Sequence, residues 1–229
     1  MKTTLFVIRH AEAEGNVGRV FHGVTDSFLT PKGHKQCERL AEELFKEDFD
    51  VIISSPLNRT RQTAEYILKG REKKLFFDED LKEINGGKWE ECTWQELSEK
   101  WPKEYETWDL RPHLHQMPDG DSVASFQKRL IGAFDKIIKE HKGKKICVVT
   151  HGTGIKTLMC HFKGVDLSQM VFFKWFDNTA ITVVEHSDEG FNLLKQGDDS
   201  HLPDNLKTVK HQDWVEDLEK RVEALKVKL

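Results

Sequence analysis

The chain has 229 residues, of which 38% are hydrophobic and 32% charged, and its formal net charge is −4. This composition is typical of a globular protein, and the lack of a basic excess argues against a nucleic-acid-binding protein. No apolar run approaches the roughly 18 residues of a membrane span, and the first apolar run is too short for a secretory signal. We therefore expect no nucleic-acid or membrane partner and a cytoplasmic location.

The first predicted strand covers residues 5–8, an apolar run without the alternation of a half-exposed strand. An amphipathic helix should follow over residues 30–47, with Thr30 as the N-cap and Pro31 at the first helical position. A second buried strand is predicted at residues 51–53.

The same helix-starting device recurs after the second strand, where Ser55 and Pro56 predict the start of a helix that ends near residue 68. Residues 78–121 then interrupt the pattern, because this stretch is too long for a simple connection. We expect a helical, aromatic-rich insertion that lies like a lid over the active-site end of the sheet. Its large aromatic side chains are Trp89, Trp94, Trp101, Tyr105 and Trp108.

The remaining elements are a helix over 122–141, a strand over 146–149, a turn and helix over 150–162, a hairpin over 178–196 and a helix over 213–229. Alternating strands and helices predict an α/β fold, with a doubly wound, mostly parallel sheet flanked by helices. We treat 1–229 as a single domain with a C-terminal extension over 196–229. The helix of that extension could close the fold, pack across a homodimer or cover a cleft.

Cysteine and histidine spacing gives little sign of a metal site. The four cysteines are scattered without a CxxC pair, and Cys37 and Cys147 stand at positions that suit buried, reduced thiols. His113 and His115 have no evident carboxylate partner nearby, so we expect them to be exposed and not to bind metal.

Polar motifs follow three predicted strands at the point where each strand ends. Arg9 and His10 follow the first, Arg59 follows the second, and His151 with Gly152 follows the strand over 146–149. The carboxyl ends of parallel strands meet at one edge of a sheet, where helix N-termini also favour anions. Arginine can hold two phosphate oxygens at once. Each motif alone is ordinary, but together they predict an anionic ligand, most simply phosphate.

Six ordered motifs between residues 3 and 195 resemble those of the histidine phosphatase superfamily, which includes the cofactor-dependent phosphoglycerate mutases. They are RHAEAEGN, GVTDSFLTPKGHKQ, SSPLNRTRQTAE, LKEINGGKWEE, MPDGDSVASFQKR and VVTHGTGIKTL. The chain departs from the family pattern at Ala11 and Glu91, where the motifs have glycine. The resemblance implies the histidine phosphatase fold and no metal or cofactor.

The resemblance also implies roles. His10 would be the nucleophile, Arg9, Arg59 and His151 would bind the phosphoryl oxygens, and Glu83 would be the general acid and base. On its residues alone Glu83 would be taken for a solvated carboxylate, since the preceding segment is equally acidic. Lesser substrate-binding roles fall to Asn16, Gly23 and Gly152.

A mutase needs extra cations opposite the transferred phosphate, and the Arg-His-Tyr segment of the mutase branch does not follow the acid here. We therefore predict a phosphatase similar to the broad-specificity bacterial members, acting on a small phosphorylated molecule. The alternatives are a cofactor-dependent phosphoglycerate mutase and, less favoured, a non-catalytic phospholigand-binding module. The insertion offers as cations only Lys88, Lys100, Lys103 and Arg111.

Overall fold

A computed structural model describes residues 1–226. Its six-stranded sheet has the order β3-β2-β4-β1-β5-β6, in which the first four strands pair in parallel and β5 pairs antiparallel with both β1 and β6. The predicted α/β fold with a mostly parallel sheet is confirmed. The short strand β3 was not predicted from the sequence. The strands are β1 (Thr3–Arg9), β2 (Val51–Ser54), β3 (Leu75–Phe77), β4 (Lys145–Thr150), β5 (Ile181–Ser187) and β6 (Gly190–Asp198).

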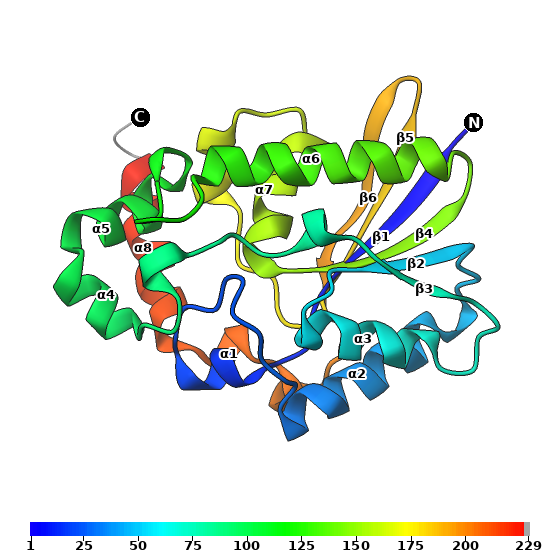
Figure 1. The fold of residues 1–229 in the computed structure, drawn as a ribbon, viewed down its shortest axis with the longest axis horizontal. Helices are drawn as coiled ribbons and strands as arrows, with labels where there is room; N and C mark the ends of the chain where they lie inside the picture. Colours follow the sequence, from blue (N-terminus) through cyan, green and yellow to red (C-terminus); the bar gives the residue numbers. More distant parts are fainter. Residues whose placement is uncertain (227–229) are drawn as a thin grey trace.

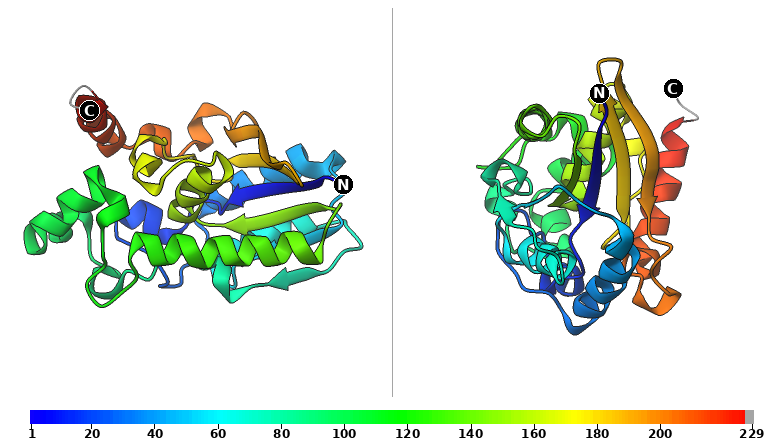
Figure 2. Two further views of the ribbon diagram at one scale, coloured as in Figure 1. Left: turned by 90° about the horizontal axis from the view of Figure 1, so that it is seen from above. Right: turned by 90° about the vertical axis from the view of Figure 1, so that its right-hand side faces the viewer.

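Helices cover both faces of the sheet (Figures 1 and 2). Side chains of β1 alternate between the two faces: Leu5 and Val7 pack with α6 and α7, whereas Phe6 and Ile8 pack with α2 and α3. The apolar run of β1 is therefore buried on both sides, as its composition predicts. The helices are α1 (Glu14–Gly18), α2 (Pro31–Glu43), α3 (Asn58–Leu68), α4 (Trp94–Lys100), α5 (Pro102–Leu110), α6 (Val123–Glu140), α7 (Gly152–Phe162) and α8 (Asp213–Lys226).

The two predicted helix starts have different outcomes. Thr30 caps α2 as predicted, and its hydroxyl accepts a hydrogen bond from the backbone N–H of Gly33 at 3.0 Å. The prediction of Ser55 and Pro56 at the start of α3 was wrong, because α3 begins at Asn58. The Asp26 carboxylate accepts the first backbone N–H of α3 at 2.7 Å instead. A distant carboxylate thus replaces the local cap, and Ser55 is left for the site described below.

Residues 78–121 contain α4 and α5 and carry an aromatic cluster. The ring centroid of Trp89 lies 4.7 Å from that of His115 and 5.8 Å from that of Phe21, and Trp108 lies 5.7 Å from Phe21. His115 is buried among these rings with 2% of its surface exposed, so the prediction that it is exposed was wrong. Edge-on aromatic packing stabilises such a cluster beyond the burial of its area.

The C-terminal helix α8 packs against the aromatic segment. An ion pair at 2.7 Å joins Arg221 of α8 to Asp109 of α5, and the rings of Trp214 and Trp175 lie 6.1 Å apart. The helix predicted over 213–229 is observed as far as residue 226, and its last three residues lie outside the described part of the chain.

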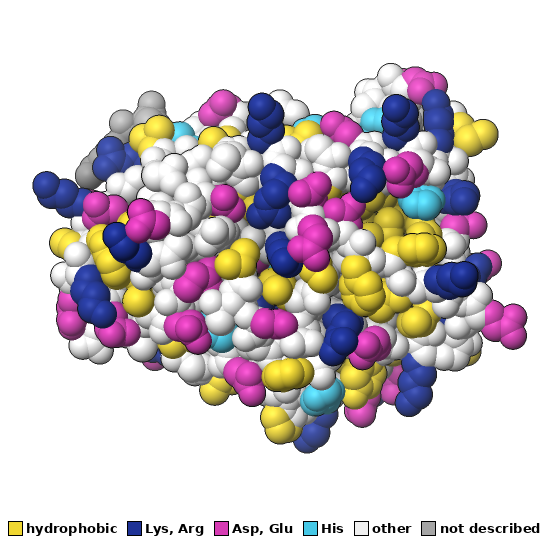
Figure 3. All heavy atoms as spheres, in the orientation of Figure 1, with side chains coloured by type: hydrophobic (Ala, Val, Ile, Leu, Met, Phe, Trp, Pro, Cys, Tyr) yellow, Lys and Arg dark blue, Asp and Glu magenta, His cyan; other side chains and the backbone are white. Residues whose placement is uncertain are grey.

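The remaining general features agree with a well-solvated globular surface. Charges of both signs are interspersed over the face in Figure 3. None of the helices in the described residues is long and apolar enough to cross a membrane. Cys37 and Cys147 are buried free thiols, as predicted.

Candidate active site

Two of the predicted site segments meet through the pairing of β1 with β4. Arg9, the last residue of β1, lies opposite Thr150, the last residue of β4. The backbone N–H of His10 donates to the carbonyl of Thr150 at 3.0 Å, which continues the pairing by one residue. The imidazole centroids of His10 and His151 are consequently 5.3 Å apart. The strand register thus brings together two histidines that are 141 positions apart in the chain.

The His10 imidazole is held in one orientation and tautomer. Its Nδ1 lies 2.8 Å from the carbonyl oxygen of Ala11, which can only accept, so Nδ1 carries the proton and Nε2 keeps its lone pair. Burial, followed by the charges of Arg59 and Arg9, lowers the pKa of His10 well below its usual value. His10 therefore presents a neutral imidazole with an unprotonated Nε2, as a nucleophile requires.

The two predicted arginines are bound differently. Arg59 is almost fully buried, and its guanidinium donates to the carbonyls of Gly23 at 2.6 Å and Thr25 at 2.8 Å. Burial lowers the pKa of Arg59 to about 10, which leaves it charged at neutral pH. Arg9 donates to the carbonyl of Phe176 at 2.5 Å, but its buried Nε has no partner among the described residues. Arg9 also lines the cavity, so its guanidinium is in a position to meet an anion there.

His151 lies at the N-terminus of α7 and is completely buried. Its Nε2 is 2.9 Å from the hydroxyl of Ser55, the residue that the capping prediction had assigned to α3. Burial and the charge of Arg59 lower the pKa of His151 well below its usual value. The second histidine is therefore also neutral in this structure. Its orientation is fixed by Ser55, the residue that follows β2.

Glu83 is not the solvated carboxylate that its local sequence suggests, since only 6% of its surface is exposed. Its carboxylate accepts backbone N–H groups of Ile84 at 2.9 Å and Thr153 at 3.0 Å. Burial raises the pKa of Glu83, and the two hydrogen bonds and the Arg59 charge oppose this shift. A carboxyl group with a raised pKa keeps its proton to a higher pH than an ordinary carboxyl group, as a general acid requires.

A cavity of about 210 Å³ lies over these groups. Of the predicted residues, its wall includes Arg9, His10, Asn16, Glu83 and Gly152, whereas Arg59, His151 and Gly23 do not line it. A Cβ at Gly152 would stand 3.2 Å from Nε of Arg9, so this glycine lets α7 approach the guanidinium closely.

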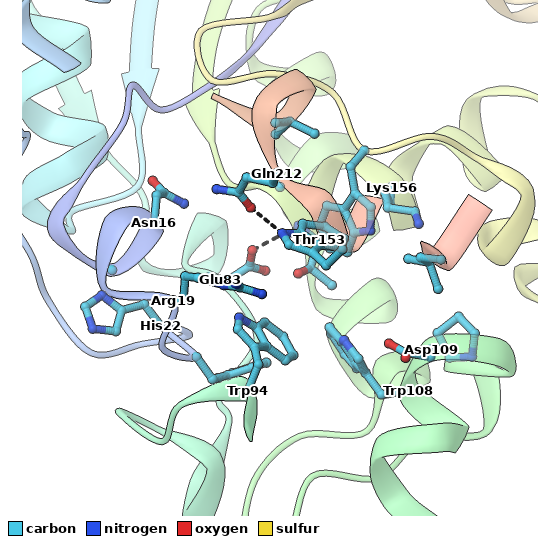
Figure 4. A pocket seen from close by; sticks show the side chains of 18 of the residues that line it. Asn16, Arg19, His22, Glu83, Trp94, Trp108, Asp109, Thr153, Lys156 and Gln212 are labelled. Carbon is cyan, nitrogen blue, oxygen red and sulfur yellow. Dashed lines mark hydrogen bonds between the residues drawn. The ribbon is translucent and has the colours of Figure 1, made fainter. Parts of the chain in front are cut away.

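Gly23 and Asn16 make contacts within the protein, in addition to the substrate-binding roles predicted for them. A Cβ at Gly23 would stand 2.1 Å from the carbonyl of Ile84, so the glycine permits close backbone packing. The side-chain oxygen of Asn16 accepts the backbone N–H of Ala13 at 2.9 Å. Asn16 nevertheless faces the cavity (Figure 4).

The outer part of the cavity is aromatic and is closed by the C-terminal segment (Figure 4). Its lining includes Gln212, Trp214 and Arg221 of the C-terminal extension. The sequence left several roles open for this extension, and in this structure it covers a cleft. Lys156 of α7 and Asp109 of α5 are further polar residues of this wall. The aromatic residues are Phe21, Trp94, Tyr105, Trp108, Trp175 and Trp214.

Two carboxylates that the sequence analysis missed hold the loops around the site by accepting their backbone N–H groups. Glu90 accepts the backbone N–H groups of residues 23–25 and of Gly86, and so fixes the loop that binds Arg59. Asp177 accepts backbone N–H groups of residues 208–210, which precede α8. The position of Glu90 in the KWEE sequence was the only available signal, and Asp177 had none. Within residues 1–226 no group of three His, Cys, Asp or Glu side chains is arranged to hold a metal ion.

Comparison with known proteins gives one consistent family. The model of the histidine phosphatase superfamily (branch 1) matches residues 5–199. Phosphoserine phosphatase 1 of Hydrogenobacter thermophilus is 35% identical over 199 residues, which cover 86% of this chain and 93% of that protein. A metal-independent phosphoserine phosphatase of Arabidopsis thaliana is 30% identical over 207 residues, covering 87% of this chain and 83% of that protein.

Solved structures agree. YhfR of Bacillus stearothermophilus has a TM-score of 0.84 and 34% identity, over 87% of this chain and 98% of that one. A phosphoserine phosphatase of Entamoeba histolytica in complex with phosphoserine has a TM-score of 0.77 and 32% identity, over 88% of this chain and 100% of that one.

Proposed function

This chain belongs to the histidine phosphatase superfamily and is a phosphatase, and we propose that it hydrolyses phosphate monoesters through a phosphohistidine on His10. Glu83 serves as general acid and then as general base. The observation that carries the proposal is the 2.8 Å contact of His10 Nδ1 with the Ala11 carbonyl, which leaves Nε2 unprotonated in a cavity that Arg9 and Glu83 also line.

In the first step Nε2 of His10 attacks phosphorus and the ester P–O bond breaks. Protonated Glu83 donates its proton to the leaving alkoxide, which would otherwise leave poorly. Nδ1–H of His10 keeps its bond to the Ala11 carbonyl, which supports the positive imidazole that forms. Arg9 donates from its guanidinium to a phosphoryl oxygen, and Arg59 acts chiefly through its charge, because its guanidinium donates to backbone carbonyls.

In the second step the Glu83 carboxylate takes a proton from water as the water attacks phosphorus. The N–P bond breaks and returns its electron pair to Nε2, so His10 is again neutral and phosphate leaves. His151 lies beside His10 and is assigned to the phosphoryl oxygens. Asn16 and Gly152 border the same space, and Gly23 supports it through the Arg59 bond.

The cations of the insertion favour hydrolysis over a mutase reaction. Lys88 pairs with Asp119 at 2.9 Å and Lys100 with Glu96 at 3.1 Å, and neither lysine lines the cavity. These lysines therefore offer a second phosphate no binding site, which favours water as the acceptor of the phosphoryl group. The phosphoserine phosphatases among the relatives support a small phosphorylated substrate, and phosphoserine is the first to test.

Phosphate release from p-nitrophenyl phosphate and phosphoserine in the presence of EDTA tests the proposal. We expect turnover by the wild type, none by His10→Ala, and wild-type turnover by His186→Ala, a histidine of β5 outside the site. Rapid quenching should also trap an acid-labile phosphoenzyme. Full activity of His10→Ala would exclude this mechanism, and no turnover by the wild type would leave a binding module.

Three features that we expect from the sequence stay predictions. They are the single domain, the cytoplasmic location and the homodimer as an alternative for the extension. Sedimentation of the full chain tests the homodimer. The lid role expected for residues 78–121 is a further prediction, and it is tested by the accessibility of Trp108 to a quencher with and without vanadate.

A further inference from the structure

Lys156 is an almost buried cation in the wall of the cavity. Only 5% of its surface is exposed, and its Nζ lies 4.5 Å from the ring centroid of Trp175. Among residues 1–226 the ammonium has no ion pair or hydrogen bond, and the Asp109 carboxylate acts on it only at longer range. A buried charge without a partner is costly, because the water that it loses is not replaced. The ammonium faces the cavity that Lys156 lines, where a negatively charged group of a substrate could pair with it.

The position of Lys156 relative to the reacting groups follows from α7. Lys156 stands four residues after Gly152, so both face the same side of the helix, about 6 Å apart along its axis. A Cβ at Gly152 would stand 3.2 Å from Nε of Arg9 and 3.4 Å from the Trp175 ring. Trp175 thus extends from the neighbourhood of Arg9 to the Lys156 ammonium. The ammonium and the Arg9 guanidinium therefore lie near the two ends of one tryptophan side chain, in the wall of the same cavity.

We propose that Lys156, backed by Trp175, is a specificity-determining residue that binds a carboxylate on the leaving group. The substrates would then be phosphate monoesters of small carboxylated alcohols or phenols. The proposal rests on the proposed phosphatase function and names the substrate class of the same cavity.

The surroundings favour one negative charge over two. Asp109 of α5 lines the same wall, and although Arg221 of α8 pairs with it at 2.7 Å, its charge still acts on Lys156. A second phosphate would bring two negative charges close to this carboxylate. Burial lowers the pKa of Lys156 to about 8, so the ammonium is mostly protonated at pH 7. Figure 4 shows Lys156 on the side of the cavity where Trp108 and Asp109 lie.

The test compares substrates that differ only in this charge. The pairs are 2-phosphoglycolate with its amide and 4-carboxyphenyl phosphate with 4-carbamoylphenyl phosphate, a short and a long pair of nearly equal shape. We expect the wild type to prefer the carboxylate in at least one pair. In that pair Lys156→Met should lower kcat/KM for the carboxylate about 10- to 100-fold more than for the amide, the range for a lost charge-assisted hydrogen bond.

Lys163→Met is the matched control. Lys163 follows the same helix and also lies over an aromatic ring, 5.1 Å from the centroid of Phe173, but it is exposed and does not line the cavity. Its removal should change neither the rates nor the preference. Equal wild-type rates within both pairs, or an equal loss on both members in Lys156→Met, would overturn the proposal. Failure of the phosphatase function looks different, because the wild type would then hydrolyse none of the four substrates.

Discussion

Loss of Glu90 should lower both stability and kcat, although this residue does not line the cavity. Its carboxylate accepts four backbone N–H groups, at 3.2 Å from Gly23, 3.0 Å from Val24 and Thr25, and 2.8 Å from Gly86. The carbonyls of Gly23 and Thr25 in turn hold the Arg59 guanidinium. Glu90→Ala therefore removes the common acceptor of the loop that positions the buried arginine.

The magnitude follows from these bonds. Hydrogen bonds to a charged group contribute about 1.5–3 kcal/mol each, but half-buried N–H groups regain part of this from water. For four such donors we expect a loss of about 2–4 kcal/mol in the free energy of unfolding, or a fall in Tm of roughly 4–16 °C. A displacement of Arg59 by about 1 Å should lower kcat about 10- to 100-fold.

Calorimetry and p-nitrophenyl phosphate kinetics, measured well below the lowered Tm, separate the two effects. Glu90→Gln keeps one acceptor oxygen but turns an NH₂ group towards the donors, so it should lie between Ala and wild type. The neighbouring, exposed Glu91→Ala is the control. If Glu90→Ala kept the Tm and the kcat of the wild type, the loop would not depend on this carboxylate and the reasoning would be refuted.

Three further variants or conditions test the site. Burial lowers the pKa of His10 and His151 in the folded state, so below pH about 6.5 the unfolded chain takes up protons that the folded chain does not. The free energy of unfolding should thus fall from pH 7 to 5 in urea titrations, and less steeply in His10→Gln; an equal slope would contradict neutral histidines. Glu83→Gln should lower kcat about 10²–10⁴-fold for alkyl phosphates but far less for p-nitrophenyl phosphate, whose leaving group needs little protonation. For alkyl phosphates wild-type kcat should fall as the pH rises through the raised pKa of Glu83, and equal losses on both substrates would argue against a general acid. Arg221→Ala breaks the 2.7 Å pair with Asp109 and should lower the Tm by roughly 2–4 °C, for about 1 kcal/mol, and speed proteolysis of α8; unchanged cleavage would show that the pair does not hold the helix.

The sequence was sufficient for elements whose signal is local. Buried strands, the Thr30 cap and the long helix over 122–141 depend on short-range patterns, and the structure has them within a few residues. β3 was missed because three residues are too few for a periodic signal. The start of α3 was misplaced because the capping carboxylate, Asp26, lies 32 residues before Asn58.

The same distinction applies to the site. Strand-end motifs predicted that His10 and His151 would converge, because parallel pairing sets their neighbourhood. No local pattern marks Glu83 as buried, and only the resemblance to a family singled it out. The roles of Glu90 and Asp177 depend on backbone N–H groups of distant loops, so apart from the KWEE motif around Glu90 no local pattern marks them.

The C-terminal wall of the cavity has an evolutionary consequence. The family match ends at residue 199, whereas the wall continues to Arg221. Bond-making groups and part of the selectivity are thus encoded in separate stretches of the gene. Substitutions after position 199 can change which substrates enter the cavity without altering the catalytic residues at the edge of the sheet. Enzymes with the same chemistry can therefore diverge in substrate specificity through their C-terminal segments.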